Sequence, residues 1–373
     1  MISNGYDASL KRPELQSEQV WVYRPVEGRD WTYSHHQSIA HYRNRYYAIW
    51  SNGKVNEDDP GQRVLVSSSP DFVNWTPPVP LIGTLQGKHS DLVLTAAGFH
   101  QYAGRLVAYV GVYEYAENNL IDGMPKTLGK GHLGTALLAV TTDNGESWSD
   151  PTEMHIPIVP NHGPQPTPSG RLIISGNISF PYTDDPSGLT GWTMTGIYPS
   201  SMSSTIYDDS EAFWKVQKTA GFPYGLCEGS FLATDDGVLH MLLRSVRNPN
   251  ARLWVTESTD DGTTWTPPVE SDFTDNNTKF HFGRLPNGAF YYVGSPDPHG
   301  RRCPLVLSLS EDGARFDRHF ILAEKVFERR VYGLHKGGVY GYPHTMIHDG
   351  HLYVICSVCK EDVLALRVPC DTL

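Results

Sequence analysis

Histidine stands at or just before the start of a strand-like run in four segments of this 373-residue chain. Imidazole has an ordinary pKa close to neutrality, so it can transfer a proton or bind a metal ion. The four segments are Tyr33-Ser34-His35-His36-Gln37-Ser38, Lys88-His89-Ser90-Asp91, Asn161-His162-Gly163-Pro164-Gln165 and Tyr342-Pro343-His344. A single histidine in such a place is more often structural. Four at equivalent places predict a functional cluster, provided that the fold brings them together.

A repeated turn indicates which fold would do so. A hydroxyl residue, an acid and a later aromatic residue recur at the end of strand-like runs, at Ser69–Trp75, Thr141–Trp148, Ser258–Trp265 and Ser310–Phe316, with a degenerate copy at Asp209–Trp214. The Asp can accept hydrogen bonds from its own turn, Gly can adopt a positive φ, and the aromatic ring can pack against the sheet. The last aromatic residues of these copies are 51 to 73 residues apart, a period typical of radially stacked sheets.

These turns and the strand-like runs between them predict an all-β chain, folded over residues 1–373 as a single β-propeller of four-stranded antiparallel blades. We count six blades. The last lacks an outer strand, and residues 19–23 can supply it and close the ring. Inner strands would then begin on one face, around the axis, and the repeated turns would lie on the other. His35, His36, His89, His162 and His344 should therefore meet at the mouth of the central channel.

The net charge of −11 argues against nucleic acid or an anionic membrane surface as a partner. No apolar run approaches the length of a membrane span. The first residues lack the charged and then apolar pattern of a secretory leader. We therefore expect either a cytoplasmic protein or a secreted or periplasmic one from which a leader has been removed. A local cluster of Arg and His could still bind an acidic substrate.

The repeated turn resembles the Asp-box, or BNR repeat, of sialidase-like β-propellers. The resemblance implies the same fold and says less about chemistry, because Asp-boxes are structural. Sialidases open their first blade with an Arg-Ile-Pro motif, whose Arg grips the substrate carboxylate. This chain reads Ser34-His35-His36-Gln37-Ser38 there, so sialidase chemistry is not expected.

A second resemblance covers about forty residues, through His35–Ile39, Tyr47–Gly53 and Glu57–Val64. These segments look like the propellers that act on L-rhamnose-α-1,4-D-glucuronate caps of arabinogalactan and gum arabic. That group contains rhamnose–glucuronate lyases and a related α-L-rhamnosidase family, and it implies seven blades rather than six. The rhamnosidase relatives rely on a first-blade His that some homologues replace with Gln. If Gln37 is that residue, the lyase is favoured.

A lyase of this kind must neutralise the uronate carboxylate, remove the C5 proton and protonate the departing O4. His, Tyr and Arg suit these tasks. We assign proton transfer to His89 and His162, with His36 or Tyr113 as the partner acid. The predicted substrate-binding residues are Arg244, Arg330, Gln37 and His344 at the carboxylate, Trp50 and Tyr342 stacking on sugar rings, and His35 and Glu228 beside them.

Three alternatives stay open. A divalent cation such as Ca²⁺ could sit in the central channel on His89, His162 and His344, helped by Gln165 or Glu228. The chain could be an α-L-rhamnosidase for the same linkage, although hydrolysis ordinarily needs paired carboxylates, and no pair stands out from the sequence. It could also be a carbohydrate-binding propeller without catalysis.

Overall fold

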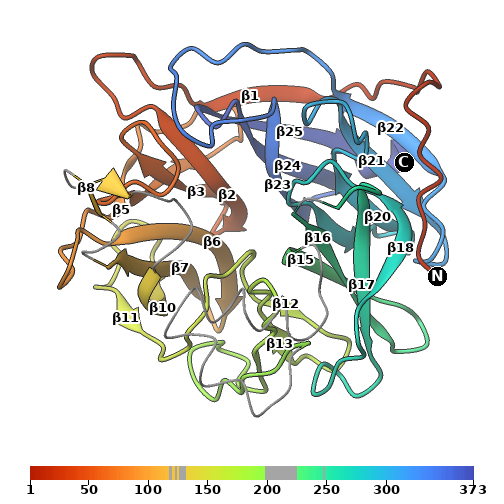
Figure 1. Ribbon diagram of the computed structural model, residues 1–373, viewed down its shortest axis with the longest axis horizontal. Coiled ribbons are helices and arrows are strands. Elements are labelled where there is room, and N and C mark those ends of the chain that lie inside the picture. Colours follow the sequence, from red (N-terminus) through yellow and green to blue (C-terminus); the bar gives the residue numbers. More distant parts are fainter. Residues whose placement is uncertain (117–119, 122–123, 126–131, 198–224, 247) are drawn as a thin grey trace.

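A computed structural model describes residues 1–116, 120–121, 124–125, 132–197, 225–246 and 248–373. The described residues form a ring of β-sheets about a central axis (Figure 1), which confirms the predicted all-β propeller. Within them, the one short helix is the 3-10 turn η3 (Cys370–Thr372). No helix in this part of the chain is long and apolar enough to cross a membrane.

Six sheets stand around the axis in the described residues, and every pairing within them is antiparallel. The first three comprise β2 (Tyr33–Tyr42), β3 (Arg45–Gly53), β4 (Arg63–Ser69) and β5 (Val79–Ile82); β6 (Val93–Tyr102), β7 (Arg105–Tyr115), β10 (His132–Thr142) and β11 (Thr152–Glu153); and β12 (Gln165–Pro166), β13 (Leu172–Ile173) and β14 (Tyr182–Thr183). The strands β8 (Leu120–Ile121) and β9 (Met124–Pro125) form a separate short pair.

The other three sheets complete the ring. They comprise β15 (Leu226–Ala233), β16 (Leu239–Ser245), β17 (Arg252–Ser258) and β18 (Val269–Thr274); β19 (His281–Arg284), β20 (Phe290–Gly294), β21 (Leu305–Ser310) and β22 (Arg318–Ala323); and β23 (Tyr340–His348), β24 (His351–Val358), β25 (Asp362–Pro369) and β1 (Glu18–Tyr23). The described residues thus give six blades, as counted from the sequence, and not the seven that the resemblance implied. Five have four strands, and the third has three.

The first strand closes the ring as predicted. β1 pairs with β25, from Glu18 opposite Arg367 to Tyr23 opposite Val363. The last blade therefore takes its inner three strands from the carboxyl end of the chain and its outer strand from the amino end. Figure 1 shows both termini on the same side of the ring.

Apolar side chains of neighbouring blades pack together between the sheets. One such cluster joins the first and last blades and contains Ile39, Trp50 and Ile355. Trp50 is fully buried there, with its ring 5.4 Å from that of Tyr23. The prediction that Trp50 stacks on a sugar is therefore wrong, because this indole belongs to the core.

The repeated turns are hydrogen-bonded much as expected. Asp71, Asp260 and Asp312 each accept bonds from backbone N–H groups of their own turn, at 2.8 to 3.0 Å. In the second copy the neighbouring Asn144 does this instead of Asp143, which pairs with Arg105. The degenerate copy at Asp209–Trp214 lies outside the described residues.

Candidate active site

Three inner strands carry a β-bulge near their first residues, on the face where the sequence predicted the functional cluster. The bulges interrupt β2, β15 and β23, and they contain His36, Glu228 and Tyr342. All three residues have left-handed backbones, with φ of 54°, 26° and 52°. A bulge adds one residue to one strand, which redirects a side chain, and such strained residues cluster at functional sites. Here all three side chains line the same cavity.

The cavity has a volume of about 340 Å³ and two kinds of wall. Apolar residues 157–160 form part of it, together with Tyr113 and His132, whose rings stack 3.8 Å apart. Its charged and titratable lining residues include His36, Glu57, Asp58, Glu228, Arg244, Lys279 and Tyr342. A cavity with an apolar side and a few convergent polar groups is the usual form of a small-molecule site.

Tyr342, Glu228 and Arg244 form a connected group. The Tyr342 hydroxyl donates a short hydrogen bond to Oε1 of Glu228, and the other oxygen of Glu228 forms an ion pair with Nε of Arg244. A weak nucleophile, a base within hydrogen-bond reach and a third group that orients the base make up the general arrangement of an activated nucleophile. The sequence predicted only that these three residues bind substrate.

Two guanidinium groups lie side by side next to this group. Nη1 of Arg244 and Nη2 of Arg302 both donate to the backbone carbonyl of Asn277, at 2.8 and 3.1 Å. Both guanidinium carbons also lie near the Tyr342 ring, 5.7 and 5.6 Å from its centroid. Paired guanidinium groups suit the planar, two-oxygen charge of a carboxylate.

Tyr342 is surrounded by positive charge. The Nζ atoms of Lys279 and Lys360 lie 5.0 and 5.8 Å from its ring centroid, in addition to the two arginines. Burial raises the pKa of the Tyr342 hydroxyl well above its ordinary value, while Arg244 acts in the opposite direction. The hydroxyl is therefore neutral at rest, and the surrounding cations favour negative charge that develops on it.

Glu57 and Asp58 are adjacent in sequence but differ in ionisation. Burial opposes charge on Glu57, yet Lys360, with Nζ 2.6 Å from Oε2, and then His36 outweigh it and lower the pKa of Glu57 to about 2. Burial, reinforced by the charge of Glu57, raises the pKa of Asp58 to about 7. One carboxyl group stays ionised, and its neighbour can hold a proton near neutrality. Such a pair divides acid and base roles.

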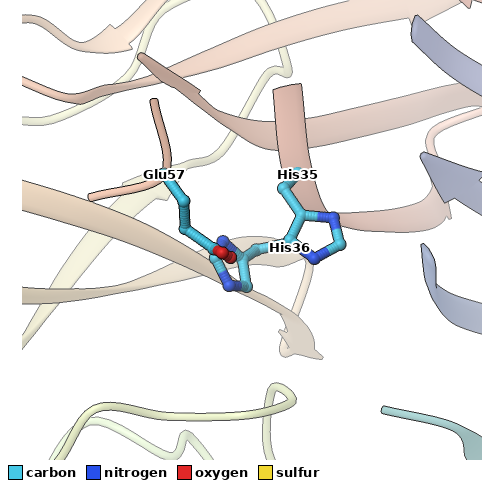
Figure 2. A group of neighbouring side chains, drawn as sticks. All are labelled: His35, His36 and Glu57. Atoms are coloured by element: carbon cyan, nitrogen blue, oxygen red, sulfur yellow. The ribbon is translucent and has the colours of Figure 1, made fainter. Parts of the chain in front are cut away.

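Among the described residues, His35, His36 and Glu57 are the one group of possible metal ligands, with one ligand atom from each within 4.8 Å of the others. Figure 2 shows the imidazole of His36 beside the carboxylate of Glu57. Glu57 is already neutralised by Lys360, and Nδ1 of His35 lies 2.8 Å from Oγ of Ser357. Burial and nearby cations, led by Lys279, lower the pKa of His36 to about 3. Positive charge on so many sides favours an anion over a metal ion.

Three histidines lie deeper along the axis. The ring centroid of His281 is 4.7 Å from those of His162 and His344. Each ring has a backbone partner: His162 with the Phe280 carbonyl at 3.0 Å, His281 with the Thr345 N–H at 3.1 Å and His344 with the Ile39 N–H at 3.4 Å. The last two contacts join neighbouring inner strands, and the first links the segments that precede β12 and β19. His162 and His344 line a second cavity on the axis and not the one that holds Tyr342.

The structure brings together only part of the predicted site. His36, Tyr113, Glu228, Arg244 and Tyr342 line the cavity, whereas the other predicted residues do not: His35, Gln37, Trp50, His89, His162, Arg330 and His344. The backbone N–H of His89 donates to Glu114, and among the described residues His89 does not form a group of possible metal ligands with His162 and His344.

The predictions for Gln37 and Arg330 are wrong for a common reason: the N–H groups that would bind a carboxylate already have partners within the protein. Gln37 is buried, and its amide donates to the backbone carbonyls of Gly341 and Tyr342. Arg330 forms ion pairs with Glu361 and Asp362 in the last blade. Neither side chain can bind a substrate carboxylate in this arrangement.

Sequence reasoning missed Lys279 and Arg302 and did not pair Asp58 with a base. Lys279 precedes β19 by two residues, and Arg302 lies in the loop before β21. A signal was present for Lys279, because it stands in the fifth blade near the position of the other inner-strand starts. No such pattern marks Arg302.

These strands and turns define a β-propeller of the sialidase type. The chain belongs to the BNR repeat-like domain family, which it matches over residues 44–354. Among solved structures it resembles a sialidase, with a TM-score of 0.66 and 19% identity over 96% of this chain and 33% of that one. No curated protein sequence matches it.

Two further solved structures share the fold. A protein of unknown function from Dyadobacter fermentans has a TM-score of 0.66 and 16% identity over 96% of this chain and 99% of its own. Trypanosoma rangeli sialidase, as a covalent intermediate with 2,3-difluorosialic acid, has a TM-score of 0.64 and 15% identity over 94% and 59%. The chain thus spans one third of the first sialidase and about three fifths of the second.

Proposed function

We propose that this protein hydrolyses a glycosidic bond in an acidic glycan, with Tyr342 as the nucleophile. The observation that carries the proposal is the connected group Tyr342–Glu228–Arg244, placed beside a second guanidinium from Arg302. Sialidases are glycosidases that use a tyrosine nucleophile in place of a carboxylate. A neutral hydroxyl has the advantage that a substrate carboxylate does not repel it.

Each step of a double displacement has a residue in the cavity. The Tyr342 oxygen attacks the anomeric carbon while its proton passes to Glu228, and protonated Asp58 gives its proton to the departing oxygen. Water then attacks the anomeric carbon and displaces the Tyr342 oxygen. Asp58 takes a proton from that water, and Glu228 returns its proton to Tyr342. Arg244 and Arg302 bind the carboxylate of the substrate.

The sequence resemblance supplies the substrate to test first, the L-rhamnose-α-1,4-D-glucuronate ends of arabinogalactan and gum arabic. The glucuronate carries the carboxylate that the two arginines would bind. Apolar residues 157–160 form part of the cavity lining and suit the methyl group of a 6-deoxy sugar such as rhamnose.

β-Elimination at the same linkage is the second candidate, and the four cations around Tyr342 favour it. They would stabilise a phenolate able to remove the C5 proton, while Arg244 and Arg302 neutralise the carboxylate. Asp58, with a pKa raised to about 7 by burial and Glu57, would protonate O4. The product would be a 4,5-unsaturated uronate.

One digestion separates the candidates. The protein is incubated with gum arabic, and released rhamnose and the ultraviolet absorbance of unsaturated uronate are followed together. Hydrolysis predicts rhamnose without that absorbance, and elimination predicts both.

A rhamnosyl donor fluorinated at C2 then tests the nucleophile. Mass spectrometry should find the sugar attached to the peptide that contains Tyr342. Tyr342→Phe should lose about 10³-fold or more in kcat. Normal turnover by Tyr342→Phe would contradict the proposal, and binding of the glycan without turnover by the parent would support a non-catalytic propeller.

A further inference from the structure

Lys279 differs from the other buried lysines of the described residues. Lys336 is buried against Glu361, with Nζ 3.2 Å from Oε1, and Lys360 is buried against Glu57 at 2.6 Å. Lys279 is 2% exposed and, with the described residues, forms no ion pair within 4.0 Å. Its Nζ donates instead to the backbone carbonyl of Asn161, at 2.5 Å.

This unpaired ammonium lies between the cavity and the axial histidines. On the cavity side it lies 5.0 Å from the centroid of the Tyr342 ring, and Glu228 is the acid whose charge it feels most. On the other side its charge acts on His162, His281 and His344, all neutral because burial lowers their pKa values. Arg244 is the remaining charged neighbour. The ammonium therefore lies close to the Tyr342–Glu228 pair as well as to the neutral histidines.

We propose that Lys279 is a positioning residue, whose buried charge stabilises the negative charge shared by Tyr342 and Glu228 as the proton moves between them. This inference rests on the proposed function, since it assigns Lys279 to the reactive pair of that site. A buried ammonium with no carboxylate in contact contributes little to folding, whereas a fixed charge beside a developing anion lowers the barrier of the reaction.

Such a role implies that Lys279 lowers stability while it raises activity. Burial lowers the pKa of Lys279 to about 8, below the value of an unfolded lysine. Below about pH 8, Lys279 is charged in both states, and its charge lowers the free energy of unfolding. This loss of stability shrinks as the pH rises from the folded pKa to the unfolded pKa, and it is absent above the unfolded pKa. Replacing the ammonium with a methyl group should relieve it.

The experiment compares Lys279→Met with Lys279→Arg and with the matched control Lys336→Met. At pH 7, Lys279→Met should raise Tm by about 1–3 °C, with a smaller gain at pH 10. Lys336→Met should lower Tm, because it removes one of the two cations that pair with the buried Glu361. On gum arabic, Lys279→Met should lose about 10- to 100-fold in kcat with little change in KM. The acid limb of its pH–rate profile should move to higher pH. Lys279→Arg should recover part of kcat.

The outcomes separate the two proposals. No turnover by the parent contradicts the proposed function. An active parent whose Lys279→Met variant keeps its kcat and pH profile contradicts only the role of Lys279. A fall in Tm for Lys279→Met as large as that for Lys336→Met would make Lys279 structural and would also overturn the inference.

Discussion

At the scale of single residues, the site obtains two kinds of carboxyl group from adjacent positions. Glu57 faces Lys360 and remains ionised, while Asp58 faces Glu57 in a buried place and keeps its proton to about pH 7. The same side-chain chemistry thus acts as a fixed charge at one position and as an acid at the next, because among the described residues a cation contacts Glu57 and none contacts Asp58.

Asp58→Asn tests this division. The acid must be protonated to act, so the parent rate should fall as the pH rises above about 7, the pKa to which burial and Glu57 raise Asp58. The variant should lose about 10²–10³-fold in kcat, and that alkaline limb should disappear. The measurement is kcat from pH 5 to 9, with rhamnose release as the signal. A limb that persists in Asp58→Asn would belong to another group.

At the scale of elements, the β-bulges convert ordinary inner strands into a site. A regular strand alternates its side chains, so a one-residue insertion reverses the direction of what precedes it. The bulge in β23 is packed closely: a Cβ on Gly341 would lie 2.7 Å from Oγ of Ser357 and 2.8 Å from the ring of His35. The space beside Gly341 therefore fixes how Tyr342 enters the cavity.

Gly341→Ala should disturb that entry. The added methyl group must move His35 or the bulge, so we expect kcat to fall by about 10-fold and stability by about 1–3 kcal/mol. Gly83→Ala is the matched control, because a Cβ there meets nothing within 4 Å, and it should leave both quantities nearly unchanged. Kinetics and urea denaturation of the two variants give the comparison. Equal behaviour would show that the bulge tolerates the methyl group.

The same bulges explain why the sequence predicted the fold better than the site. Strand alternation and the repeated turns are local signals, and they predicted six blades and closure by residues 19–23. Bulges leave no comparable mark, so Trp50 and Gln37 were assigned to the cavity although both are buried elsewhere. Arg302 comes from an irregular loop, and only the closed ring places it beside Arg244.

At the scale of the whole molecule, the site depends on closure of the ring. His36 and Tyr342 come from the first and last blades. The outer strand of the last blade is β1, from the amino-terminal part of the chain. Before β1 in the chain, Ser3 bridges to Arg315 and Asp272, and Glu14 bridges to Ile321. The amino-terminal segment thus runs along the outer edges of the fourth to sixth blades (Figure 1).

Val22→Asp tests whether activity and closure fail together. Val22 is 6% exposed and packs in the core cluster between the first and last blades, so a carboxylate there should cost about 3 kcal/mol of unfolding free energy. Glu18→Ala removes only the exposed ion pair with Arg367 and should cost less than about 1 kcal/mol. Urea denaturation followed by both tryptophan fluorescence and residual activity makes the comparison. If the ring is one cooperative structure, the two signals of Val22→Asp decline at the same urea concentration, whereas activity that outlasts the fluorescence change would show a site independent of closure.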